Sequence, residues 1–67
     1  MDDQMIITKA NQIADFFTPY TEEEAVAGIA EHIAMFWEPR MKAQLDAIIK
    51  AGGEGLLPQV KTAAETL

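Results

Sequence analysis

The proline at position 39 constrains the fold of this chain more than any other residue. Proline has no backbone N–H to donate inside a helix, and its ring disfavours the α conformation of the preceding residue, Glu38. The same ring suits the first position of a new helix. One apolar helical stripe ends on Phe36 and Trp37, and the next begins at Met41. The sequence therefore predicts a tight corner between two helices.

The ten residues from 32 to 41 also hold the only His, the only Trp and the only Arg of the chain. We expect the rings of Phe36 and Trp37 to fix how the two helices meet, because they supply most of the bulky apolar surface there. Trp37 shares its stripe with Ile33, which places it in the protein's own core. Arg40 is the first cation after an acidic half and is expected to be an ion-pair residue, either within the chain or with a partner carboxylate. The predicted partner interface comprises His32, Met35, Phe36, Trp37, Pro39, Arg40 and Met41.

Apolar residues recur along the chain with the 3.6-residue period of an α-helix. Helices are predicted at residues 2 or 3 to 17, 22 to 37, 39 to 51, and from 58 onward. No segment alternates with period two, so no strand is predicted. We therefore expect one all-α domain of three to four helices over residues 1–67. The residues expected to face the core are Ile6, Ala10, Ile13, Phe17, Val26, Ile29, Ile33, Phe36, Trp37, Met41, Leu45, Ile48, Ile49, Val60, Ala63, Ala64 and Leu67.

Local signals mark the ends of these helices. Asp2 or Asp3 is placed to cap the first helix. Thr21, with Glu24 three residues later, has the spacing of a capping box at the start of the second. The pair Gly52-Gly53 is free to adopt the left-handed conformation that ends the third.

Charge is distributed unevenly along the sequence. Residues 1–38 carry eight acidic side chains and one Lys, a net charge of −7, whereas residues 39–67 carry four basic and three acidic side chains, a net charge of +1. The sum is the −6 of the whole chain. A nucleic-acid-binding protein needs a basic stripe to neutralise phosphates, and none is present. An anionic membrane surface is disfavoured for the same reason.

The 67-residue length leaves little core, and there is no Cys to form a disulfide or a thiolate metal site. The remaining sources of stability are good helix packing or association with something else, and of these we favour association. The longest apolar run, residues 33–37, is far shorter than the roughly 20 residues that span a bilayer. The amino terminus lacks the cationic and apolar regions of a secretory signal. The expected location is the cytoplasm.

No set of residues indicates catalysis or ligand binding. His32 is the only His, lies at the margin of an apolar stripe, and is expected to be a hydrogen-bonded packing residue. Glu22 to Glu24 are explained by the positive end of a helix dipole. Gly52 to Gly55 lack the pattern and the Lys of a phosphate-binding loop. We therefore predict no catalytic residue, no bound cofactor and no metal site.

Two features are open to more than one interpretation. Asn11 and Gln12 lie away from the centre of the first apolar stripe, either as a solvated polar edge or as hydrogen-bonding groups for a partner. Met35 lies beside Gly28 on the opposite side of the second helix from its main stripe. This placement predicts either chance exposure or a second, shallow contact surface.

Taken together, the motifs resemble the delta subunit of NAD-dependent formate dehydrogenase, and the likeness extends over nearly the whole chain. Its most specific part is the pattern His-x-x-x-Phe-Trp-x-Pro-Arg-Met. The residues that carry it are Ala10-Asn11-Gln12-Ile13-Ala14, Phe16-Phe17, His32, Phe36-Trp37, Pro39-Arg40-Met41, Gly52-Gly53, Leu56 and Pro58.

The resemblance implies a small accessory subunit of a cytoplasmic bacterial formate dehydrogenase. In such enzymes the larger subunits hold the molybdenum or tungsten pterin, the iron–sulfur clusters and the flavin (FMN), so this chain is expected to bind none of them. The resemblance also implies a non-catalytic role in assembling or stabilising the enzyme. The alternative is a free-standing acidic helical interaction module, either a homodimer or a maturation chaperone that leaves once the cofactor is inserted.

Overall fold

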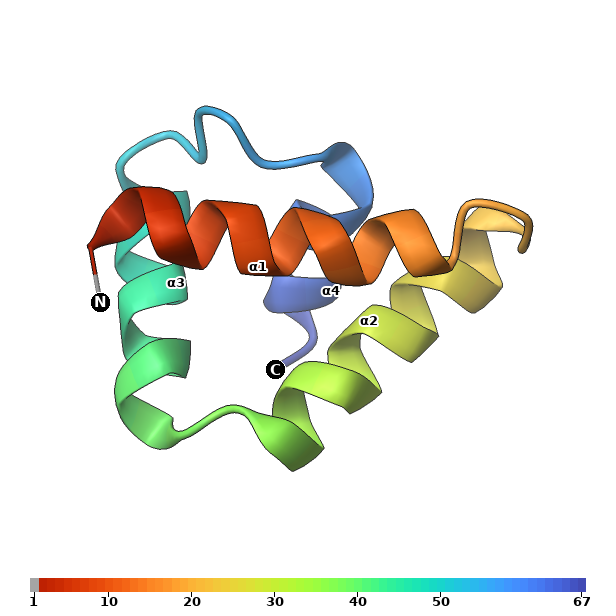
Figure 1. The fold of residues 1–67 in the computed structure, drawn as a ribbon, viewed down its shortest axis with the longest axis horizontal. Coiled ribbons are helices and arrows are strands. Elements are labelled where there is room, and N and C mark those ends of the chain that lie inside the picture. The colour runs from red at the N-terminus through yellow and green to blue at the C-terminus, as the bar shows by residue number, and fades with distance from the viewer. Residues whose placement is uncertain (1) are drawn as a thin grey trace.

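The computed structural model describes residues 2–67 and contains four α-helices (Figure 1). They are α1 Asp3–Phe16, α2 Glu22–Phe36, α3 Pro39–Lys50 and α4 Pro58–Glu65. No strand occurs within the part of the chain that the structure describes. The predicted all-α fold is confirmed, and α1, α2 and α3 each end one residue earlier than expected.

The helices begin at the capping residues and prolines that the sequence predicts. The Asp2 carboxylate accepts a hydrogen bond from the N–H three residues on, at 2.8 Å. Thr21 and Glu24 form the full capping box: the Glu24 N–H donates to Thr21 Oγ1 and the Thr21 N–H donates to Glu24 Oε1, both at 3.2 Å. Pro39 and Pro58 occupy the first positions of α3 and α4, where their missing N–H groups cost nothing.

The glycine pair ends α3 as predicted. Gly52 and Gly53 both have positive φ, at 120° and 65°. The Gly53 N–H donates to the carbonyl of Ile48 and the Gly52 N–H to that of Ile49, the two hydrogen bonds of a Schellman motif. This motif turns the chain into the loop over residues 51–57, which leads to α4.

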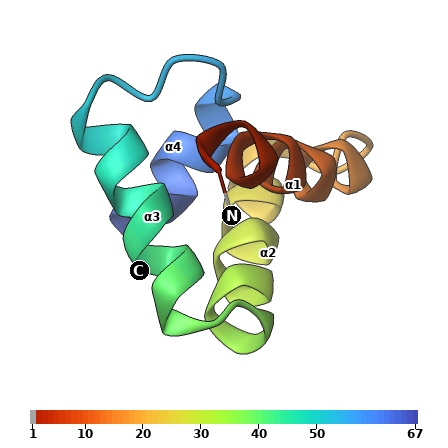
Figure 2. The ribbon, with the colours of Figure 1, turned by 60° about the vertical axis from the view of Figure 1, so that its left-hand side comes forward.

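The helices do not pack in chain order. α2 packs mainly on α4 and α1 packs mainly on α3, whereas α2 and α3, which the corner joins, make little direct contact. In both views of the ribbon α4 lies between α2 and α3 (Figures 1 and 2), and Figure 1 shows α1 crossing in front of the other helices. The corner therefore separates two helices instead of pressing them together.

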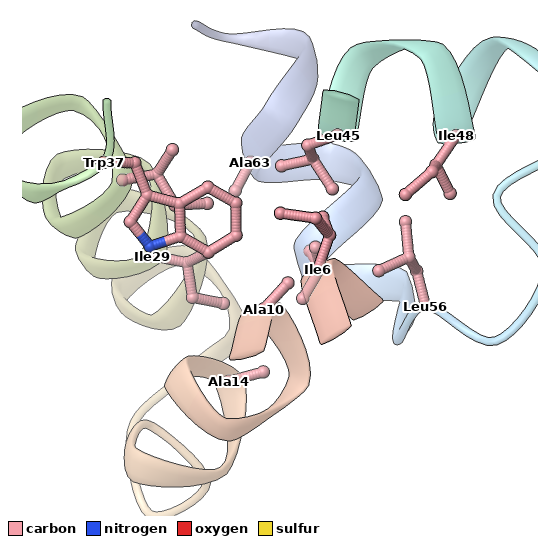
Figure 3. Packing of buried hydrophobic residues seen from close by; sticks show 11 residues of the cluster. Ile6, Ala10, Ala14, Ile29, Trp37, Leu45, Ile48, Leu56 and Ala63 are labelled. Atoms are coloured by element: carbon pink, nitrogen blue, oxygen red, sulfur yellow. The ribbon is translucent and has the colours of Figure 1, made fainter. Parts of the chain in front are cut away.

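The core draws on every helix and on the loop over residues 51–57. Ile6, Ile29 and Leu45 are among its fully buried side chains. Figure 3 shows the indole of Trp37 directed into this core, toward Ala63 of α4. The buried cluster comprises Ile6, Ala10, Ala14, Ile29, Ile33, Trp37, Leu45, Ile48, Leu56, Val60 and Ala63.

Two residues expected in the core lie outside it. Phe36 is 69% exposed and Leu67 is 52% exposed, so both predictions were wrong. Leu67 lies two residues beyond the end of α4 and is not carried on the apolar face of that helix. Phe36 is the last residue of α2, and the chain beyond it is extended and turns Trp37 inward in its place. Only one of the two rings at the corner therefore fixes the packing.

Asn11 has a structural role that neither interpretation of the sequence anticipated. Its Nδ2 donates to the carbonyl of Gly55 at 2.8 Å, and its Oδ1 accepts from the N–H of Leu57 at 3.0 Å. These bonds join α1 to the loop that leads into α4, more than forty residues away in sequence. We call these two hydrogen bonds of Asn11 the clamp, because they hold the loop against α1. The neighbouring residue Gln12 is exposed.

A glycine also allows a close approach between α1 and α2. A Cβ on Gly28 would overlap ring carbons Cε1 and Cζ of Phe17, the residue that caps the end of α1. The Phe17 ring is held on its other sides by Phe16, with ring centroids 5.0 Å apart, and by Tyr20, at 5.4 Å. Gly28 therefore leaves room for this ring against α2.

Asn11→Ala should destabilise the isolated chain by about 1 kcal/mol, because two backbone groups lose their partner near the surface. For a domain of this size that loss lowers the Tm by roughly 4–8 °C. Gln12→Ala is the matched control, since the Gln12 side chain makes no hydrogen bond within residues 2–67. Thermal melts of both variants decide the matter, and equal Tm values would contradict the clamp.

Gly28→Ala should lower the Tm although Ala is the better helix former. Overpacking against Phe17 costs about 1–3 kcal/mol, which exceeds the gain of at most about 1 kcal/mol in helix propensity. In a Phe17→Ala background the same substitution should raise the Tm, because the overlapping ring is gone. Thermal melts of the four proteins in this double-mutant cycle test the contact. A rise in both backgrounds would show that Phe17 moves aside without cost.

Candidate docking surface

An open groove of about 600 Å³ lies between the second half of α1, the end of α2 and the corner. We call it the aromatic groove, because four of its nine lining residues are Phe or Trp and a fifth is His. It is lined by Lys9, Gln12, Ile13, Phe16 and Phe17 from α1 and its cap, by His32, Phe36 and Trp37 from α2 and its cap, and by Met41 of α3.

The groove has a packed floor and an exposed rim. Trp37 is only 8% exposed, and Phe17 is half-buried. Phe16 and Phe36 are each 69% exposed. His32 is exposed too, and its ring lies against that of Phe36 with centroids 4.9 Å apart. The core therefore holds the floor in place, while the rim presents two large rings to solvent.

A smaller hollow of about 290 Å³ adjoins the groove on the outer side of α2. It shares Phe17, His32 and Phe36 with the groove and adds Gly28, Glu31 and Met35. Met35 is 67% exposed there. Both interpretations of Met35 expected this exposure, and the choice between them stays a prediction.

The predicted interface residues separate into three groups. His32, Phe36, Trp37 and Met41 line the groove, and Met35 lines the adjoining hollow. Pro39 and Arg40 are exposed and line neither. Arg40 makes no ion pair within the described residues, where the one salt bridge joins Lys50 to Asp46 at 2.9 Å.

His32 does not have the role expected of it. It was predicted to be a hydrogen-bonded packing residue, but its side chain makes no hydrogen bond within residues 2–67 and contacts an aromatic ring instead. Its position on the surface of the last two turns of α2 explains the difference. There the imidazole covers part of Phe36, which would otherwise be still more exposed.

The interface predicted from the sequence did not include the side of the groove that α1 forms. Phe16 and Phe17 are adjacent in sequence, and neighbouring helical residues point about 100° apart. Two such rings cannot both face the same core. That adjacency was a signal that one ring at the end of α1 is exposed.

The lining of the groove suits association by burial of apolar surface. The charged groups along the groove and the hollow are Lys9 and Glu31. Within residues 2–67 no three His, Cys, Asp or Glu side chains are grouped as metal ligands. Over the same residues no helix is long and apolar enough to cross a membrane.

Comparison with curated proteins and with solved structures found no match. The sequence model of one family does match, over residues 5–64, and its description is NADH-dependent formate dehydrogenase delta subunit FdsD. This match covers all but seven of the 67 residues and confirms the resemblance noted above. The chain therefore belongs to the delta-subunit family of NADH-dependent formate dehydrogenase.

Proposed function

We propose that this chain is a non-catalytic accessory subunit that binds the larger subunits of a formate dehydrogenase through the aromatic groove. Membership of the family implies larger partner subunits. The observation that carries the proposal is the exposure of Phe16 and Phe36, 69% each, on the rim of one groove. Fully burying a Phe side chain contributes about 1.5–3 kcal/mol. A partner that covers both rings would gain a large part of this free energy for each of them.

The division of chemistry between the subunits is part of the same proposal. The larger subunits would hold the molybdenum or tungsten pterin, the iron–sulfur clusters and the FMN. The residues of this chain do not fit an iron–sulfur cluster, because the sequence has no Cys to supply the thiolate ligands. Its one imidazole lies against Phe36 and makes no hydrogen bond within residues 2–67. We assign this chain the task of assembling or stabilising the enzyme.

The alternative of a maturation chaperone uses the same groove but differs in stoichiometry. A permanent subunit remains in a fixed ratio with the larger chains after purification, whereas a chaperone is lost once the cofactor is in place. Quantifying the subunits of the active enzyme by mass spectrometry separates the two roles.

Phe36→Ala should weaken assembly with the larger subunits by tenfold or more, the change that corresponds to about 1.4 kcal/mol. Its effect on the Tm of the isolated chain should be small, because the ring is mostly in water. Leu67→Ala is the matched control: Leu67 is 52% exposed but lies outside the groove and the hollow. Co-purification with the larger subunits and formate-dependent NAD reduction on dilution measure assembly. If both variants assemble equally well, the groove is not the docking surface.

Replacing Trp37 by Ala should lower the stability of the chain, whereas replacing Arg40 by Ala should weaken assembly. Trp37→Ala empties a large buried site and should cost about 3–5 kcal/mol of stability. Arg40→Ala should leave the Tm nearly unchanged, since Arg40 is exposed and without an ion pair in the described part of the chain. It should weaken assembly instead, because a bidentate contact with a partner carboxylate is lost. Normal assembly of the Arg40 variant would place this residue outside the interface.

A further inference from the structure

The end of α2 lacks the features that usually stabilise the last turn of a helix. Its last turn contains no basic side chain, and its cap residue Trp37 is extended. Among residues 2–67, those with positive φ are all glycines of the loop over residues 51–57, so α2 has no left-handed cap. By contrast, α3 ends on Lys50 and the Schellman motif. The carbonyls of the last turn of α2 therefore need another donor.

Lys42 supplies that donor from the other side of the corner. Its side chain is half-buried, and its Nζ donates to the carbonyl of Ala34 at 3.0 Å. In a continuous helix this carbonyl would accept from the N–H of Glu38, but α2 has already ended there. The ammonium group also places a positive charge at the negative end of the α2 dipole, and such a charge strengthens the hydrogen bond. We call this hydrogen bond the corner bond.

The corner bond joins two helices that touch each other little. α2 packs mainly on α4, and α3 packs mainly on α1. The connection between α2 and α3 consists of Trp37 and Glu38, both extended. Pro39 restricts its own φ and the conformation of Glu38, but these restrictions alone do not fix the angle between two helices. A side chain that reaches from the first turn of α3 to the last turn of α2 does restrict that angle.

We propose that Lys42 is a positioning residue of the docking surface, which holds the corner at one angle through the corner bond. The aromatic groove crosses the corner: Phe36 and Trp37 line it from α2 and its cap, and Met41 lines it from α3. A change in the angle between α2 and α3 therefore changes the shape of the groove. By keeping one shape before a partner binds, the corner bond lowers the cost of ordering the groove on binding. The docking role of Lys42 rests on the proposed function, whereas its effect on the corner does not.

Amide hydrogen exchange in the isolated full chain tests the effect of Lys42 on the corner. Lys42→Met removes the charge and the donor but keeps a long unbranched side chain. It should speed exchange of the Trp37 amide, which donates to the Ile33 carbonyl at the end of α2, by about three- to tenfold. The Ala25 amide, in the first turn of α2, should change less than about twofold, because the opening is local.

Lys50→Met is the matched control, because it makes the same substitution on the same helix. Lys50 is exposed, forms its ion pair with Asp46 one turn away, and lines neither the groove nor the hollow. This control should leave exchange at Trp37 within about twofold of the unsubstituted chain, since an exposed ion pair contributes little. Lys42→Arg keeps the charge and N–H donors and should restore most of the protection.

Three results of these measurements would overturn the inference. Equal exchange at Trp37 in Lys42→Met and Lys50→Met would show that the corner bond does not hold the end of α2. An equal rise at Trp37 and Ala25 would show that Lys42 stabilises the whole fold and not the corner. If Lys42→Met does not fold, NMR of the unsubstituted chain decides instead. A scalar coupling across the corner bond, between Lys42 Nζ and the carbonyl carbon of Ala34, is then the expected result, and its absence is the third contrary one.

Assembly with the larger subunits separates this inference from the proposed function. Lys42→Met should weaken assembly about threefold or more, and Lys50→Met less than about twofold. If Phe36→Ala impairs assembly and Lys42→Met does not, the groove is the docking surface but Lys42 does not position it, and the inference is overturned. If neither variant impairs assembly while exchange at Trp37 rises as expected, the proposed function fails and the effect of Lys42 on the corner stands.

Discussion

The end of α2 before Pro39 decides which aromatic ring enters the core. Trp37 is the last residue with a helical hydrogen bond, from its N–H to the carbonyl of Ile33 at 3.1 Å, but its backbone is already extended. Glu38 is extended as well, as a residue before proline must be. The extended pair turns the indole inward and leaves Phe36 on the surface. One constraint therefore supplies both the buried floor of the groove and an exposed ring on its rim.

A chain of this size needs close helix packing, because it has little volume in which to bury large side chains. Small residues make that packing possible. Ala10 and Ala14 of α1 and Ala63 of α4 are buried where helices meet, and Gly28 makes room for Phe17. The clamp from Asn11 then fixes the long loop between α3 and α4, which has no helix of its own. Phe16 and Phe36, in contrast, lie on the surface, each 69% exposed.

How far the sequence predicts this structure depends on the range of each interaction. The capping box at Thr21 and Glu24, the proline at position 39 and the glycine pair at 52 and 53 act within one helical turn, so the helix ends were predicted to within a residue. The bonds of Asn11 span more than forty residues. Helical periodicity says which face of α1 is apolar, but not which loop folds back onto its polar edge.

The same distinction explains why only part of the groove was predicted. The corner residues are consecutive in the sequence, and their unusual composition marks them without knowledge of the fold. The other side of the groove comes from α1, and its position depends on how α1 crosses α2, which no local pattern encodes. Charged side chains of both signs lie along or beside the groove: Lys9 lines it, Glu31 lines the adjoining hollow, and Arg40 and Lys42 are the sequence neighbours of Met41. Exposed apolar rings on a small protein mark a surface for association, and a partner that covers Phe16 and Phe36 would remove both rings from water.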